Sequence, residues 1–424
     1  MTATPKHQPG IRFTLIMIVV ATITPMPQSV NAMTVNEAVA AALARHPTLS
    51  AAGSEVKAAH SEVKAAKSGY LPSISASGGP QGASPDEWAY EVTVAQPVYD
   101  WGATTDKVDS ARATEQQRRI EWTIARDQSA SDVIEIYLDV MQGQMQHEAN
   151  LSQIEALENL SRMTSIRADG GYADRSEPDR TRLELARARQ RLASDMGQAA
   201  NACAQFETLV GAPPDGLVQP RPASMMQRIK GMYLEALIDE APLYRKALKE
   251  THYALARFSE ARSSAMPHVN LEATALSREI NGRMANDAVI ALRLRMTPMQ
   301  GLASFDRIDA ARERVEAAHW KEAATRRDIA RALQDLITNA TALDQQEQAL
   351  LQQVSDAENL SSVYFEQFEV GRRDIIDLVT IQRELFDARR SLIEVTLQLV
   401  RIQYRIASQI GKLSDLVALP SDPL

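Results

Sequence analysis

The sequence predicts a mainly α-helical chain with a small β part, built as two tandem repeats of one unit. The 424 residues include only 5% aromatic side chains, a composition typical of long helices and coiled coils. Two stretches, 102–168 and 301–368, contain no proline, and each would be on the order of 100 Å long as a single helix. The two halves also align without a gap from Asp106 on Asp306 to Gly211 on Gly411, with identities roughly four times as frequent as chance predicts.

The N-terminus has the pattern of an export signal. Lys6 and Arg12 precede the uncharged run 13–24, and the small-residue step Val30-Asn31-Ala32 follows. A bilayer-spanning helix needs about 20 apolar residues, so this run is too short to be one. We therefore expect a signal peptide over 1–32, which leaves either a soluble exported protein or a β-barrel membrane protein.

The first repeat is predicted over 33–211. Pro72 ends its first helix, and Gly171 interrupts the helical pattern between the long helix and the helix that returns alongside it. Between the first helix and the long helix, apolar residues alternate with polar or small residues, which indicates a β-hairpin with its turn in 78–82. The predicted elements are a helix over 34–68, the hairpin over about 72–98, the long helix over about 102–168, the tip over about 169–175 and the return helix over about 176–211.

A proline-rich linker, 212–230, separates this unit from the second repeat, predicted over 231–411. The second hairpin has its turn near Asn281-Gly282. Apolar residues of the last helix, from Ile381 to Ile406, alternate in steps of four and three, the heptad spacing of a coiled coil. The predicted elements are a helix over about 231–265, the hairpin over about 268–298, the long helix over about 301–368, the tip over about 369–374, the return helix over about 375–411 and a tail over 412–424.

Two hairpins give four amphipathic strands, too few to close a barrel. Open sheet edges are prohibitive inside a bilayer, so we expect three chains to share one twelve-stranded transmembrane β-barrel, continued by the helices as an α-barrel tunnel. Arg293 and Arg295 admit two interpretations, an ordinary polar lining or contact with anionic cargo. The predicted lipid-facing residues are Trp88, Tyr90, Val92, Val94, Ile290, Leu292 and Leu294, and the predicted lumen residues are Glu91, Thr93, Arg293 and Arg295.

Other classes of function find little support. The net charge of −8 leaves no basic surplus for nucleic acid. Cys203 is the only cysteine, so a disulfide framework and a cysteine metal cluster are excluded. No paired histidine motif, phosphate-binding loop or nucleophile elbow is present. We therefore expect no enzyme activity, no metal and no cofactor.

The chain resembles the TolC family of trimeric outer-membrane efflux and secretion ducts. The resemblance covers the mature chain through the two repeats, the order of elements, and the motifs Gln96-Pro97-Val98-Tyr99-Asp100-Trp101-Gly102 and Gly371-Arg372-Arg373-Asp374-Ile375-Ile376-Asp377. It implies a homotrimer in the outer membrane of a Gram-negative bacterium that extends into the periplasm. It also implies a periplasmic adaptor and an inner-membrane ABC or RND transporter as partners.

The same resemblance implies a gate at the periplasmic tip. Asp377 falls on an acidic constriction ring, and Thr380 stands where the family has a second acid. Arg373 falls on a latch arginine, with Ser176 and Glu177 as its expected partners and Phe368 in place of a latch tyrosine. An alternative for Glu177 and Asp377 is that each only stabilises a helix N-terminus.

We therefore expect a channel that passively conducts substrates outward, for type I protein secretion or multidrug efflux. The competing interpretation is a soluble periplasmic coiled-coil adaptor or scaffold, which would bury its apolar strand rows in a compact β-domain of its own.

Overall fold

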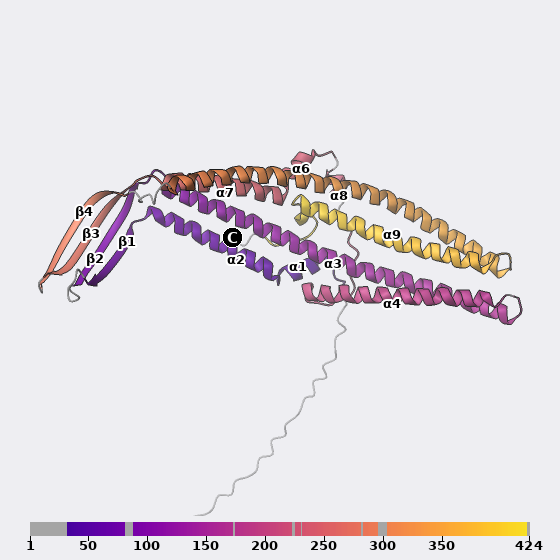
Figure 1. Cartoon of the computed structure of the whole chain (residues 1–424). Helices are drawn as coiled ribbons and strands as arrows, with labels where there is room; N and C mark the ends of the chain where they lie inside the picture. The colour runs from indigo at the N-terminus through magenta and orange to yellow at the C-terminus, as the bar shows by residue number, and fades with distance from the viewer. Residues whose placement is uncertain are drawn as a thin grey trace, which may run out of the picture.

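The computed structural model describes residues 32–80, 88–172, 174–222, 225–229, 231–280, 283–295 and 303–421. The predicted signal peptide up to residue 31, residues 81 and 82 of the first predicted hairpin turn and the turn at Asn281-Gly282 lie outside the described residues. Residues 78–80, predicted as part of that first turn, are the end of a strand instead. The molecule is elongated, with a four-stranded sheet at one end and two helical hairpin tips at the other (Figure 1). The predicted class, mainly α with a small β part in two repeats, is confirmed.

The first half of the chain contains two short helices, two strands and two long helices. These are α1 (Val35–Leu43), α2 (Pro47–Lys67), β1 (Ser73–Pro80), β2 (Trp88–Tyr99), α3 (Ala103–Asp169) and α4 (Ser176–Val210), with a 3₁₀ turn at Ser68–Tyr70. The second half repeats this order after α5 (Met225–Ile229). It comprises α6 (Leu234–Glu240), α7 (Pro242–Ser264), β3 (His268–Ile280), β4 (Arg283–Arg295), α8 (Ala303–Glu369) and α9 (Ile375–Gln409), with a 3₁₀ turn at Leu413–Asp415.

The first helix of each repeat is divided in two, so the single helices predicted over 34–68 and about 231–265 are wrong. Pro47 and Pro242 each begin the second piece. The residues before them, His46 and Ala241, have extended backbone with ψ of 115° and 129°. Proline has no N–H to continue a helix and disfavours helical backbone in the residue before it, so each proline starts a helix rather than extending one.

The repeats match closely in their long elements. Helices α3 and α8 both have 67 residues, and α4 and α9 both have 35. Gly171 and Gly371 have φ of 74° and 72°, a left-handed conformation that costs glycine little and suits the end of a helix. The ion pair between Arg189 and Glu158, at 2.7 Å, has its counterpart between Arg389 and Glu358, at 2.6 Å.

The helices form one layer with two open sides. Helix α3 packs on α2 and α4 along one flank and on α7 and α9 along the other, and α8 packs on α7 and α9 beyond them. Among the described elements, α2 and α4 therefore border one side and α8 borders the other. The predicted heptad seam lies largely inside the layer, because Ile381, Leu385, Val395 and Ile406 are buried.

The sheet is antiparallel in the order β1-β2-β3-β4, so β1 and β4 are its edges. Its register separates two faces: Val94 lies beside Ile74 and Ala273, whereas Thr93 lies beside Ser75 and Thr274. A β-bulge at Val98 interrupts this alternation, because Pro97 pairs with Asn270 and Tyr99 with the very next residue, Val269. The extra residue turns Tyr99 onto the apolar face.

The main core lies where α1, α3, α4, α9 and the C-terminal tail meet. Tyr137 and Phe206 are inaccessible to solvent there, with ring centroids 6.2 Å apart. The Tyr137 hydroxyl lies 2.8 Å from the carbonyl oxygen of Met33 and 2.7 Å from that of Val218. Burial raises the pKa of Tyr137 to about 12. This core holds the start of α1 and the linker between the repeats against the middle of α3.

Candidate functional site

The apolar face of the sheet is broadly exposed. All seven residues predicted to face lipid lie on this face, and Ile290, Leu292 and Leu294 are 77%, 67% and 69% exposed. A contiguous apolar surface of this kind is rare on a soluble monomer and marks a contact with lipid or with another protein.

Aromatic pairs border this face at both ends. Trp88 and Tyr90 stack with ring centroids 6.4 Å apart at the end of β2 far from the helices, and Tyr99 contacts Trp101 edge to face at 5.0 Å beside the helices. The nine steps from Tyr90 to Tyr99 span about 30 Å along the strand, and a strand tilt of about 40° reduces this to about 23 Å. Outer-membrane barrels carry an apolar band of about 25 Å between two aromatic girdles.

The polar face carries the four residues predicted to line a lumen, Glu91, Thr93, Arg293 and Arg295. The hydroxyl of Thr93 donates to Glu91 Oε1 at 3.1 Å and lies 3.1 Å from the hydroxyl of Thr274. Sequence reasoning missed Glu272, which lies between the two arginines and is 2% exposed. The signal that could have found it is the alternation of β3, in which Glu272 stands between Leu271 and Ala273.

At the opposite end of the molecule, Arg373 binds residues of its own helix pair. Its guanidinium lies 3.0 Å from Asp377 Oδ2 and donates to Gln367 Oε1 at 3.2 Å. The guanidinium carbon also lies 3.9 Å from the ring centroid of Tyr364, a cation–π contact. Arg373 precedes the N-cap of α9, and Asp377 lies in the first turn of that helix, only four residues further along the chain.

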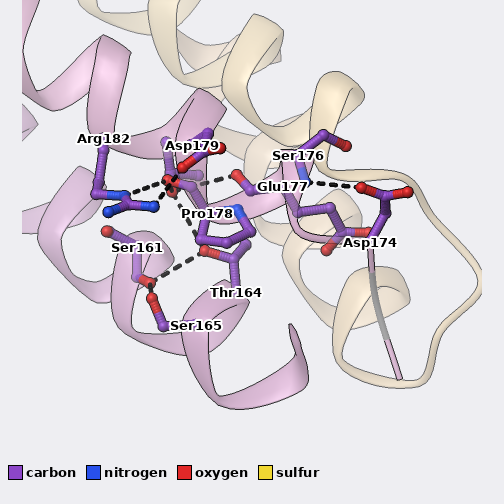
Figure 2. Close-up of polar contacts among 10 residues, drawn as sticks. Ser161, Thr164, Ser165, Asp174, Ser176, Glu177, Pro178, Asp179 and Arg182 are labelled. Carbon is purple, nitrogen blue, oxygen red and sulfur yellow. Dashed lines mark hydrogen bonds and ion pairs between the residues drawn. The ribbon is translucent and has the colours of Figure 1, made fainter. Parts of the chain in front are cut away.

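Within the single chain, no contact among the described residues joins Arg373 to Ser176 or Glu177, and their pairing stays a prediction. The backbone N–H of Ser176 instead donates to Asp174 Oδ1 at 2.8 Å (Figure 2). Glu177 Oε2 is buried and accepts no hydrogen bond among the described residues. Burial raises the pKa of Glu177, and the positive charge of Arg167 acts in the opposite direction.

Arg167 joins the two tips. Its Nη1 donates to the carbonyl oxygen of Phe368 at 2.9 Å, and its guanidinium lies 4.5 Å from the centroid of that ring. Phe368 itself is inaccessible to solvent and packs with Leu160, Ile375 and other apolar residues of the tip. Phe368 is thus a core residue of the tip, and Arg167 links the two helix pairs.

Comparison with known proteins identifies the family of the chain. The family described as outer membrane efflux protein matches residues 38–212 and 234–412, one match to each repeat. The chain belongs to this family. Its members are transport channels of the Gram-negative outer membrane that extend into the periplasm, and they are not enzymes.

Solved channels of similar fold include VceC of Vibrio cholerae, at 15% identity over 89% of this chain and 96% of that one, with a TM-score of 0.74. CmeC of Campylobacter jejuni shares 12% identity over 89% and 86%, with a TM-score of 0.76. The open state of MtrE of Neisseria gonorrhoeae shares 15% over 89% of both chains, with a TM-score of 0.74. No curated protein sequence matches the chain significantly.

This outer membrane efflux protein carries neither a spanning helix nor a metal cluster in its described part. Within the described ranges, no helix is both long and apolar enough to cross a bilayer, and no three His, Cys, Asp or Glu side chains gather as metal ligands. Thr380, where the TolC family has a second acid, donates its hydroxyl to the Ile376 carbonyl at 2.7 Å within its own helix.

Proposed function

We propose that three copies of this efflux protein form one duct that passively conducts substrates across the outer membrane. The observation that carries this proposal is that the sheet and the helical layer are open on the same two sides. The edge strand β1 follows α2, and the edge strand β4 precedes α8. If a second copy were placed edge to edge with the first, β4 of one copy would pair with β1 of the other. The same placement would pack α8 of the first copy against α2 and α4 of the second.

The number of copies follows from the need for a passage. Two copies would give eight strands, and the interior of an eight-stranded barrel is only wide enough to be filled by side chains. Three copies would give twelve strands, the smallest multiple of four that leaves a lumen. In this arrangement the exposed apolar face contacts lipid between the two aromatic borders, and the polar face with Glu91, Thr93, Arg293 and Arg295 lines the passage.

The duct itself supplies no energy. The sequence contains no phosphate-binding loop, so the driving force must come from partners at the far end. We assign this role to a periplasmic adaptor and an inner-membrane ABC or RND transporter that meet the tips of α3–α4 and α8–α9. The family's description supports efflux as the transport process, and type I protein secretion is the alternative use of the same duct.

The edge-to-edge arrangement can be tested by cross-linking. In a Cys203→Ser background, Ser77→Cys on β1 and Asp287→Cys on β4 place thiols on exposed residues of the two edge strands, at the same level and on the same polar face of the sheet. Within one chain these edges are three strand spacings apart, about 14 Å, so a bis-maleimide shorter than this joins only different copies. We expect dimer and trimer bands from an outer-membrane fraction, and no ladder from either single-cysteine variant.

Two outcomes would refute the duct. Absence of cross-linked trimer, together with monomeric soluble protein and no shift in migration between unboiled and boiled samples, would favour the soluble adaptor or scaffold instead. A ladder that stops at the dimer would refute the threefold arrangement.

A further inference from the structure

A compact charged cluster lies on the polar face of the sheet where β3 and β4 join the helices. The Glu272 carboxylate lies 3.2 Å from Arg293 Nε and 2.8 Å from Arg295 Nε, and Arg295 Nη2 donates to it at 3.0 Å. Glu272 is almost completely buried, whereas the side chains of Arg293 and Arg295 are 51% and 62% exposed. The acid is therefore covered, and the two cations are the groups that a solute would meet.

The cluster retains positive charge after this pairing. One carboxylate neutralises one of the two guanidiniums, so each chain keeps one net positive charge here. Each guanidinium has five N–H donors, and Glu272 occupies few of them. Donors free on two neighbouring guanidiniums are suited to carboxylate, sulfate and phosphate groups.

Nearby residues do not cancel this charge. Asn270 is opposite Arg293 in the register and His268 is opposite Arg295, so neither position adds an acid. Asp100 is the acid at the adjacent junction, and its carboxylate accepts the backbone N–H groups of Gly102 at 3.0 Å and Thr104 at 2.8 Å. That carboxylate is engaged in capping the start of α3.

At the other end of the molecule, the acid predicted to form a constriction ring is paired with a cation. The Asp377 carboxylate is paired with Arg373 at 3.0 Å, and the next position on the same face is Thr380. A pair of opposite charges at this distance presents little net field to a passing ion compared with a free carboxylate ring.

We propose that Arg293 and Arg295 form an anion filter at the helix-side end of the barrel, so that the duct conducts small anions in preference to cations. This inference rests on the proposed duct, because only a closed barrel brings three copies of the cluster around one passage. In the trimer, six guanidiniums and three buried carboxylates would surround the passage. The cargo class favoured by this charge is organic solutes that carry carboxylate, sulfonate or phosphate groups.

The test is ion selectivity of the trimer in planar bilayers under a potassium chloride gradient. We expect a reversal potential that shows chloride preference in the wild type. Arg293→Ala with Arg295→Ala should shift the permeability ratio toward potassium by roughly twofold or more. Arg293→Lys with Arg295→Lys should keep the preference, and Glu272→Gln should strengthen it because one negative charge per chain is removed.

Arg283→Ala is the control for position: it removes one positive charge per chain from the far end of the same strand, against two in the double alanine variant, and we expect less than half of the double variant's shift. Cation preference in the wild type, or an equal shift from Arg283→Ala and the double alanine variant, would overturn the filter while leaving the duct intact. Trimers without any conductance would overturn the duct and the filter together.

Discussion

Asp195 holds the two repeats together away from the sheet. Its carboxylate accepts Arg390 Nη2 at 2.9 Å from α9 and Asn150 Nδ2 at 2.7 Å from α3. Asp195 is 5% exposed, and Asn150 is 1% exposed. The Asp195→Ala substitution would leave a guanidinium and a buried amide without their acceptor.

The expected cost follows from this burial. Removing one member of a buried ion pair typically costs about 3 to 5 kcal/mol, because the remaining charge is left unpaired. The Arg390 side chain is 28% exposed, so water can partly replace the lost carboxylate. We therefore expect Asp195→Ala to lower the free energy of unfolding by about 3 kcal/mol, near the lower end of that range. In a protein of this size, that corresponds to a fall in melting temperature of about 4 °C.

Thermal unfolding followed by far-ultraviolet circular dichroism of the detergent-solubilised protein would measure this loss. The matched control is Glu358→Ala, which breaks the single ion pair between Glu358 and Arg389, whose side chains are 46% and 39% exposed. An exposed pair contributes about 0 to 1 kcal/mol, so the control should lower the melting temperature by about 1 °C at most.

The effect also has a pH signature. The hydrogen bond from Arg390, followed by that from Asn150, lowers the pKa of Asp195 below its ordinary value of 3.8, against the effect of burial. A depressed pKa stabilises the fold above the ordinary value, and this contribution is lost as the pH falls through the folded-state pKa. The difference between wild type and Asp195→Ala should therefore narrow below about pH 3.8. Two results would refute this account. One is a fall in melting temperature for Asp195→Ala no larger than that for Glu358→Ala, and the other is a difference between wild type and Asp195→Ala that stays the same in acid.

Three further predictions concern the sheet, the core and the tip. Val92→Arg on the apolar face should cost about 2 to 4 kcal/mol in a bilayer and abolish heat-modifiable migration, whereas Thr93→Arg on the polar face should be tolerated. Because the pKa of Tyr137 is raised from 10.0 to about 12, stability should be complete below pH 10 and fall as the pH rises toward 12. Tyr137→Phe should remove this loss in alkaline denaturation curves. In bilayer recordings, Arg373→Ala and Glu177→Ala should change the closed-state conductance independently of each other. When these changes are expressed as free energies, the change in the double variant should equal the sum of the two single changes within about 0.5 kcal/mol. A larger deviation from the sum would support the predicted latch between the two residues.

The long helices and the strand faces could be predicted because their signals are local and periodic. Absence of proline marks α3 and α8, and alternation places Ile290 and Leu292 on one face of β4. The interruptions before Pro47 and Pro242 also had a local signal, since proline prevents helix continuation. Small and apolar residues continue the helical pattern on both sides of each proline, and this continuity outweighed the helix-breaking signal of the proline in the prediction.

The contacts between distant residues could not be predicted in the same way. The position of Glu272 between two arginines depends on the register of β3 on β4, and a shift of one residue would place it on the other face. The bond between Asp195 and Arg390 depends on how α4 and α9 lie beside α3, which periodicity does not specify. For Arg373, the nearby Asp377 was the better guide, because it lies in the first turn of α9 only four residues further along the chain.

The internal duplication changes how a tunnel of this kind assembles. A chain with a single helix–hairpin–helix unit would need six molecules to build the wall of the proposed trimer, and the formation of that wall would depend on the sixth power of subunit concentration. Covalent fusion of two units reduces the dependence to the third power, which favours complete tubes at low expression levels. Fusion also allows the tips of the two repeats to diverge in sequence, as the different partners of Arg167 and Arg373 show. A protein that docks on the ring of tips would therefore contact two kinds of tip in alternation.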